Sequence, residues 1–328
     1  MGHVQTTRIE QERHHAGHRP VSRKQAQACL PRGTMVAGYE LLKCIGIGGQ
    51  AAVYDTRSFH RGGFHRRVAM KVSHVHPQGS KNAPGSLLHE AQQLRSLTHS
   101  GVVGVFGSGR ENGLEYIAME RIEGVSLKRL LRRGGALPLG ACVDIGIKLC
   151  DALAYLHGQL SARPTHPLLH LDLKPGNVMV TSTGEVKLID FGVSRSLDKT
   201  DDMRPAGYGT PAYMAPEQIL RGTLSPATDV FSVGALLFEM ATGRRIFEGK
   251  DVNKLLVERV REETVTGDSE ERSTGCRALD RTITRAIRRN PQARTRKAQF
   301  LGRSLRMLKR RVGYDRRLND YLSCPQVC

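Results

Sequence analysis

The sequence predicts an α+β protein of two lobes, in which a small β-rich lobe with one main helix precedes a larger, mostly helical lobe. Short runs of alternating apolar and polar residues, typical of strands, fill residues 39–119 around a single helical pattern. Long amphipathic patterns, typical of helices, dominate after residue 124. The 35 Gly and 14 Pro among 328 residues favour a loop-rich fold, and 39% hydrophobic residues can form a large core.

The pattern of each segment places the individual elements. In the first lobe we expect a helix over 86–96 and strands over 39–47, 51–56, 67–72, 102–107 and 114–119. In the second lobe we expect helices over 139–156 and 227–242 and short strands at 178–180 and 186–189. The domain is expected to span 36–312, with lobes over about 39–119 and 125–312 and a hinge over 120–124.

The two ends of the chain carry most of its formal net charge of +19. Residues 1–35 hold six Lys or Arg against two acids and no periodic apolar positions, so we expect a flexible basic arm. Residues 285–328 hold thirteen Lys or Arg against two acids; within them 303–312 predicts a helix that packs through Leu305 and Leu308, and 313–328 a short tail. Such basic ends attract an acidic protein, nucleic acid or an anionic membrane.

The sequence also predicts the compartment. No run of apolar residues is long enough for a transmembrane segment, and residues 1–20 lack the apolar core of a secretory signal, so we expect a cytoplasmic protein. The seven Cys are odd in number and form no CxxC pair, which favours reduced thiols over a disulfide framework or a zinc site. His14, His15 and His18 lack acidic or Cys partners, so no metal site is expected there.

A glycine-rich turn joins the first two expected strands. It runs from Ile45 through Gly46, Gly48 and Gly49, and glycines let backbone N–H groups approach a polyphosphate with no Cβ in the way. Taken alone, such a glycine-rich turn is more often an ordinary hairpin than a phosphate-binding turn. The strand that follows it excludes the Rossmann and P-loop sites, because both require a helix directly after the glycines.

A lysine lies in the apolar strand 67–72. An unpaired ammonium at Lys71 would be costly to bury, so it requires an anionic partner, either phosphate oxygens or the carboxylate of Glu90 in the expected helix. Taken singly, the two residues are better explained as a surface lysine and an exposed helical glutamate; the functional interpretation depends on their combination.

Two segments of the second lobe carry hard oxygen ligands. The sequence His-Leu-Asp-Leu-Lys-Pro-Gly-Asn ends at Asn177 and contains Asp172, and Ile-Asp-Phe-Gly follows with Asp190. These oxygens suit Mg²⁺ and leave one carboxylate to orient a hydroxyl. Both segments follow the glycine turn and the strand lysine in this order, so it is improbable that they are ordinary turns that contain acids by chance.

In this order the motifs resemble the signature set of the eukaryotic-type, or Hanks-type, protein kinase family over about residues 39–312. The resemblance implies the bilobal kinase fold and a serine/threonine protein kinase that transfers the γ-phosphoryl group of ATP. The expected metal is Mg²⁺, with Mn²⁺ as an alternative. The expected substrates are Ser and Thr hydroxyls of proteins, including the chain itself, in signalling. The form of the motifs is similar to that of soluble bacterial members.

The resemblance implies a role for each motif residue. Lys71 would contact the α- and β-phosphates and pair with Glu90, while Asn177 and Asp190 would hold the metal. Asp172 would accept the substrate proton. Lys174 would neutralise charge on the transferred phosphoryl group, and Thr210 would contact Asp172. Glu217 would form an ion pair with Arg294, and Asp229 would anchor the backbone of the catalytic loop.

The nucleotide would lie between the lobes, with its phosphates under the glycine turn at Ile45, Gly46, Gly48 and Gly49. The expected adenine contacts are Val53 and Ala69 above the ring, Met179 below it, Met119 as the gatekeeper, and the backbones of Glu120 and Ile122.

Three positions depart from the family pattern. Ala51 stands where the third glycine usually lies, and residues 161–167 are an insertion expected to form a surface loop. Leu171 replaces the arginine that commonly precedes the catalytic aspartate, so no cation is available there to receive a phosphorylated activation segment. We therefore expect activity that does not depend strictly on that phosphorylation.

Two other classes of function stay open on the sequence alone. One is a pseudokinase that binds nucleotide without catalysis, although every residue that the chemistry needs is present. The other is a nucleic-acid-binding protein that acts through its basic C-terminal part. A small-molecule phosphotransferase is disfavoured by Thr210 and the Ala-Pro-Glu segment at 215–217, which are typical of protein substrates.

Overall fold

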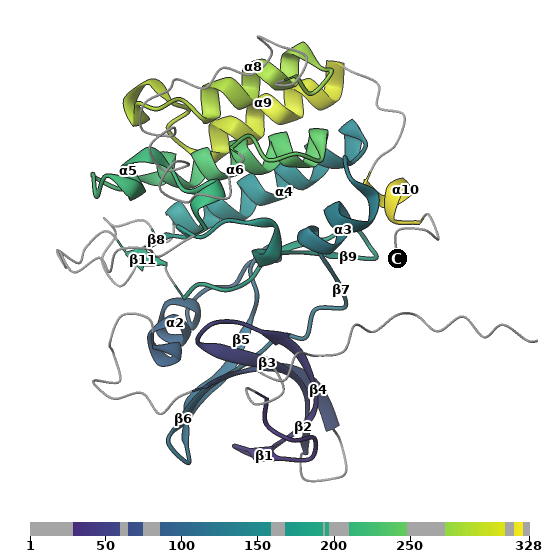
Figure 1. Ribbon diagram of the computed structural model, residues 1–328, viewed down its shortest axis with the longest axis vertical. Helices are drawn as coiled ribbons and strands as arrows, with labels where there is room; N and C mark the ends of the chain where they lie inside the picture. Colours follow the sequence, from purple (N-terminus) through teal and green to yellow (C-terminus); the bar gives the residue numbers. More distant parts are fainter. Residues whose placement is uncertain are drawn as a thin grey trace, which may run out of the picture.

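The computed structural model describes residues 29–59, 65–74, 86–158, 168–192, 194–196, 210–247, 273–311 and 318–323. It confirms the predicted α+β fold: within these residues a sheet lobe with one helix is joined to a helical lobe by a short connection (Figure 1). The insertion at 161–167, the histidines of the N-terminal arm and residues 1–28 in general lie outside the described ranges.

The N-terminal lobe is a six-stranded antiparallel sheet in the order β1-β2-β3-β4-β6-β5. Alternation of side chains places Leu41, Tyr54 and Met70 in a buried cluster on one face. The strands are β1 (Met35–Val36), β2 (Tyr39–Ile47), β3 (Ala51–Phe59), β4 (His65–Ser73), β5 (Val105–Glu111) and β6 (Leu114–Met119).

Helix α2 (Leu87–Leu94) packs against this sheet near β5 and β6. It begins at Leu87 because the Ser86 hydroxyl accepts a hydrogen bond from Leu88 N–H at 3.1 Å, which satisfies one free donor of the first turn. Leu87, Ala91 and Leu94 recur at helical spacing and are buried, so one face of the helix is fixed on the sheet.

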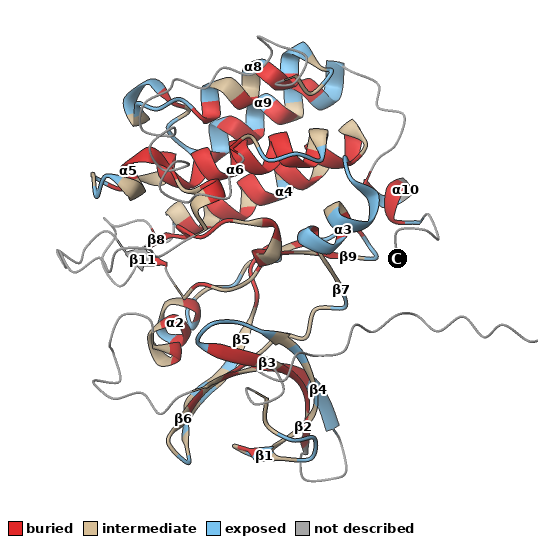
Figure 2. Cartoon of the chain, viewed as in Figure 1, coloured by how far each residue is buried: buried red, intermediate tan, exposed pale blue. Residues whose placement is uncertain are grey.

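The C-terminal lobe is built around two long helices, α4 (Leu139–Gly158) and α6 (Pro226–Thr242). Every residue from Ala227 to Met240 is buried, so α6 is a core helix that other elements surround (Figure 2). The other described elements of this lobe are β7 (Gly124–Ser126), α3 (Leu127–Gly134), β8 (Leu168–Leu169), β9 (Val178–Thr181), β10 (Val186–Leu188), β11 (Arg195–Ser196), α5 (Pro216–Ile219), α8 (Arg277–Ala286), α9 (Ala298–Arg311) and α10 (Leu318–Leu322). Among the described helices, none has the length and apolar character that a membrane crossing requires.

Helix α9 packs on α4 through Leu305 and Leu308, both buried, as its spacing predicts, while its cations Arg303 and Arg310 are exposed. It is followed by α10, in the segment expected to be a tail. Leu318 of α10 is buried, and α10 packs against α4.

Two segments differ from the predicted elements. Strand β5 begins at Val105 rather than 102, because Val102 forms a parallel bridge with Leu188 and Val103 N–H donates to Leu188 O at 3.0 Å. The backbone of these two valines thus connects the N-terminal lobe to β10 of the C-terminal lobe. Within the expected arm 1–35, Met35 pairs with Glu40 of β2, so the end of that segment belongs to the sheet.

Candidate active site

The strand lysine, the α2 glutamate and the Asp-Phe-Gly aspartate meet at one point. Lys71 Nζ lies 2.7 Å from Glu90 Oε2 and 2.8 Å from Asp190 Oδ1. The second oxygen of Glu90 accepts a hydrogen bond from Phe191 N–H at 3.1 Å. Both oxygens of the buried Glu90 therefore have hydrogen-bond donors, and these contacts link β4, α2 and the Asp-Phe-Gly segment.

The charges at this point favour the ionised forms of Lys71 and Asp190, whereas burial raises the pKa of Glu90. Burial opposes the charge on Lys71, but the carboxylates of Glu90 and Asp190 outweigh it and raise the pKa of Lys71 above its ordinary value. Burial likewise opposes the charge on Asp190, yet Lys71 outweighs it and lowers the Asp190 pKa. Asp190 has φ +65°, a left-handed conformation that is strained for a residue other than glycine.

The second group of predicted residues surrounds Asp172. Lys174 Nζ lies 2.5 Å from Asp172 Oδ2, and Asn177 Nδ2 donates to the same oxygen at 3.1 Å and to the Asp172 carbonyl at 2.9 Å. The Thr210 hydroxyl donates to Asp172 Oδ1 at 3.5 Å. Because Asn177 donates through its amide nitrogen, its carbonyl oxygen is the atom left for a metal ion.

A buried carboxylate holds the backbone of the catalytic loop. Asp229 accepts hydrogen bonds from His170 N–H and Leu171 N–H, each at 2.9 Å, and from His157 Nε2 at 2.8 Å. Burial would raise the pKa of Asp229, but the hydrogen bond from His157 and the other donors outweigh it and lower that pKa. Leu171 itself has φ +64° and is buried with Leu169 and Leu224. Asp229 therefore fixes a strained turn directly before Asp172.

The expected nucleotide contacts of the first lobe lie on β2, β3, β4 and β6 and at the hinge. Gly46 pairs with Val53 and Ala69 pairs with Met119 in the strand register. Gly48 N–H donates to Ala51 O at 2.9 Å and closes the glycine turn, whereas Ile45 and Gly49 are exposed.

At the hinge, Glu120 N–H donates to Gly104 O at 2.8 Å, so a ligand donor would meet the Glu120 carbonyl instead. The Glu120 carboxylate lies 3.0 Å from Lys187 Nζ of β10. Lys187 in turn pairs with Met179 of β9 in the antiparallel sheet. Ile122 packs against the C-terminal core. The predicted adenine residues thus come from both lobes and the hinge.

The Ala-Pro-Glu segment is fastened by a buried ion pair. Arg294 Nη1 lies 2.7 Å from Glu217 Oε1, and Nη2 donates to Glu217 Oε2 at 3.1 Å. Arg294 also donates to the carbonyls of Ala227 and Arg288, each at 2.8 Å. This network fixes the end of the activation segment on the start of α6.

Sequence reasoning missed Glu115, a buried acid on β6. Its Oε2 accepts hydrogen bonds from Leu87 N–H and from the Ser86 hydroxyl, each at 2.9 Å, and its Oε1 from Arg110 at 2.9 Å. Glu115 therefore anchors the start of the helix that carries Glu90. The sequence pattern that could have indicated this role is an acid inside an otherwise apolar strand, with a cation on the preceding strand of the hairpin.

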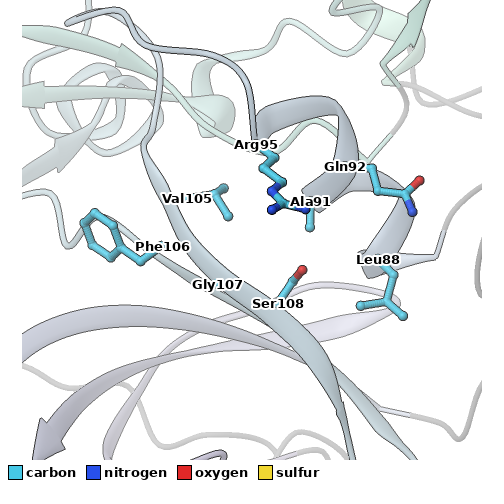
Figure 3. Close-up of a pocket in the computed structure, with 8 residues that line it drawn as sticks. All are labelled: Leu88, Ala91, Gln92, Arg95, Val105, Phe106, Gly107 and Ser108. Atoms are coloured by element: carbon cyan, nitrogen blue, oxygen red, sulfur yellow. The ribbon is translucent and has the colours of Figure 1, made fainter.

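The outer side of α2 borders a pocket of about 570 Å³ between this helix and β5 (Figure 3). None of the predicted nucleotide-binding residues lines it, so it is separate from the nucleotide site. The lining residues are Leu88, Ala91, Gln92, Arg95, Val105, Phe106, Gly107 and Ser108.

We expect Glu115→Ala to lower kcat/KM for ATP by about tenfold, because two donors at the start of α2 lose their acceptor and Glu90 loses its fixed position. Glu115→Gln keeps an acceptor oxygen and should lose less. Initial rates at varied ATP measure both effects. Glu40→Ala, which removes a partly exposed acid from the same sheet, is the control and should leave kcat/KM unchanged. An unaltered kcat/KM in a folded Glu115→Ala protein would contradict the anchoring role.

Comparison with known proteins agrees with this geometry. The protein kinase domain model matches residues 39–304. The chain therefore belongs to the protein kinase domain family, whose members use ATP and a divalent metal ion. It is 31% identical over 274 residues to the probable serine/threonine-protein kinase CPE1738 of Clostridium perfringens, an alignment that covers 83% of this chain and 38% of that protein.

A second relative is the serine/threonine-protein kinase PknB of Mycolicibacterium smegmatis, 31% identical over 263 residues, which cover 78% of this chain and 40% of PknB. The probable serine/threonine-protein kinase CE0033 of Corynebacterium efficiens is 30% identical over 282 residues, 83% of this chain and 41% of the relative. The chain thus spans less than half the length of these relatives.

Proposed function

We propose that the chain is a serine/threonine protein kinase that transfers the γ-phosphoryl group of ATP to protein hydroxyls, its own included. The arrangement of Asp172 carries the proposal, since this carboxylate lies within hydrogen-bond reach of Lys174, Asn177 and the Thr210 hydroxyl. A carboxylate so placed can accept a substrate proton, and the neighbouring ammonium can offset charge on the transferred group.

We propose Mg²⁺ as the metal, with Mn²⁺ as an alternative. The Asp190 carboxylate and the Asn177 amide oxygen are hard ligands, and Mg²⁺ is commonly held by one or two protein oxygens together with substrate phosphates. The metal would offset phosphate charge. Lys71, held by Glu90, would bind the phosphates, and Asp172 would orient the hydroxyl.

The direct test is incubation of the purified chain with labelled ATP, Mg²⁺ and a general protein substrate, followed by mapping of phosphosites by mass spectrometry. We expect label on Ser and Thr of the substrate and of the chain itself. Nucleotide binding without transfer would instead indicate a pseudokinase. Transfer to small molecules alone would exclude a protein substrate.

The neutral residue before Asp172 leads to a prediction about regulation. Leu171 is buried among apolar side chains and offers no cation to a phosphorylated activation segment. We therefore expect the chain to keep most of its initial rate after complete phosphatase treatment, as measured before it can rephosphorylate itself. Loss of all activity after dephosphorylation would contradict this.

We also propose a cytoplasmic location, a kinase domain that extends beyond the expected limits 36–312 to include Met35 and α10, and a docking role for the basic C-terminal part. In the described residues, α9 exposes Arg303, Arg310 and Arg311 together with Phe300 and Met307. Such a surface suits an acidic protein, nucleic acid or an anionic membrane. Binding to each at low salt, and its loss at high salt, tests the electrostatic part of this role.

A further inference from the structure

Two cysteines that are far from a CxxC spacing meet in the N-terminal lobe. Cys29 Sγ and Cys44 Sγ lie 2.7 Å apart, although the residues are 15 positions apart in the sequence. Both are free thiols and both are only partly buried, so small oxidants can reach them. A disulfide bond is about 2.05 Å long, so a movement of less than about 1 Å would join the sulfurs.

The segment around Cys29 is held in place by further contacts. Leu30 N–H donates to the Tyr54 hydroxyl at 2.7 Å, and Cys29 and Leu30 both pack on the buried cluster that contains Tyr54. The Cys44 thiol also donates weakly to Gly46 O at 3.6 Å, within the glycine turn. The pair therefore lies where the N-terminal segment meets the strand that enters the glycine turn.

We propose that Cys29 and Cys44 form an oxidative modification site, in which a two-electron oxidant such as hydrogen peroxide converts the two thiols into an intramolecular disulfide. The bond would tie the N-terminal segment covalently to β2.

The reaction balances in two steps. Cys29 first attacks the peroxide, the O–O bond breaks, and a sulfenic acid and one water form. The Cys44 thiol then displaces the hydroxyl from that sulfur, and the disulfide and a second water form. Burial and the contact with Cys29 raise the pKa of Cys44 to about 12, so the first step falls to Cys29.

Mass spectrometry tests the site without any need for kinase activity. After treatment with peroxide and blocking of free thiols, non-reducing tryptic digestion should yield peptide 25–32 linked to peptide 44–57. Cys29→Ser and Cys44→Ser should each abolish this species, whereas Cys276→Ser, which removes a partly buried thiol from the other lobe, should retain it. The same linkage should form in the Asp172→Asn protein, which separates this site from the proposed function.

Two results would overturn the proposal. One is recovery of Cys29 and Cys44 as unlinked thiols or oxyacids under conditions that oxidise Cys276. The other is linkage of Cys29 to a second molecule of the chain rather than to Cys44. Thermal unfolding gives an independent measure, since the disulfide restricts the unfolded chain and should raise the Tm of the oxidised wild type by roughly 5 °C, with no rise in oxidised Cys29→Ser.

Discussion

Asp172→Asn should lower kcat for phosphoryl transfer by about 10²–10⁴-fold while binding of ATP stays close to that of the wild type. The amide has the size of the carboxylate, so the loop that Asp229 holds can keep its shape. It has no negative charge with which to accept a proton, and it loses the ion pair with Lys174. Steady-state rates give kcat, and titration calorimetry gives the affinity for ATP.

A matched control is Asp151→Asn on α4, whose partly exposed carboxylate pairs with Arg306 on the surface. This variant should transfer phosphate at the wild-type rate. If Asp172→Asn kept the wild-type kcat, Asp172 would have no part in proton transfer and the proposed catalytic role would be wrong.

Arg294→Met should destabilise the folded chain by about 3–5 kcal/mol and lower its Tm by about 10 °C. The guanidinium is fully buried, and its removal leaves the Glu217 carboxylate buried beside a neutral donor, the Thr228 hydroxyl at 3.0 Å. The Ala-Pro-Glu segment would also lose its link to α6, so activity should fall with stability. Thermal unfolding followed by circular dichroism measures the effect.

The double variant Arg294→Met with Glu217→Gln separates the two contributions. Removing the uncompensated charge should restore part of the lost Tm. Arg306→Met, which breaks a half-exposed ion pair, should shift the Tm far less than Arg294→Met. Equal shifts in Arg294→Met and Arg306→Met would contradict the importance of burial.

The catalytic centre could be predicted because its chemistry restricts both residue type and order. A lysine in an apolar strand requires an anion, and the sequence offered Glu90 and Asp190 as partners; the structure brings all three within hydrogen-bond distance. Strands β2 and β6 also begin and end at the predicted residues, because glycine turns or polar residues follow them.

Other features depend on contacts between distant segments, which no local pattern contains. Val102 reads as the start of a strand, yet it pairs with Leu188 of the other lobe. The acceptor role of Glu115 depends on where α2 is packed, and the contact of Cys29 with Cys44 depends on the path of the chain before β1. Helix α3 was missed because it is short and rich in Arg and Lys.

Strand β6 has anchored groups at both ends. Glu115 at its start is bonded to the first residues of α2, and Met119 at its end faces Ala69 directly before the hinge. Because both groups lie on one six-residue strand, we expect order imposed at one end to extend to the other. Such coupling is reciprocal. A compound that orders the hinge should slow amide hydrogen exchange in α2, and a partner that binds α2 should raise the binding affinity of that compound by the factor by which the compound raises the affinity of the partner.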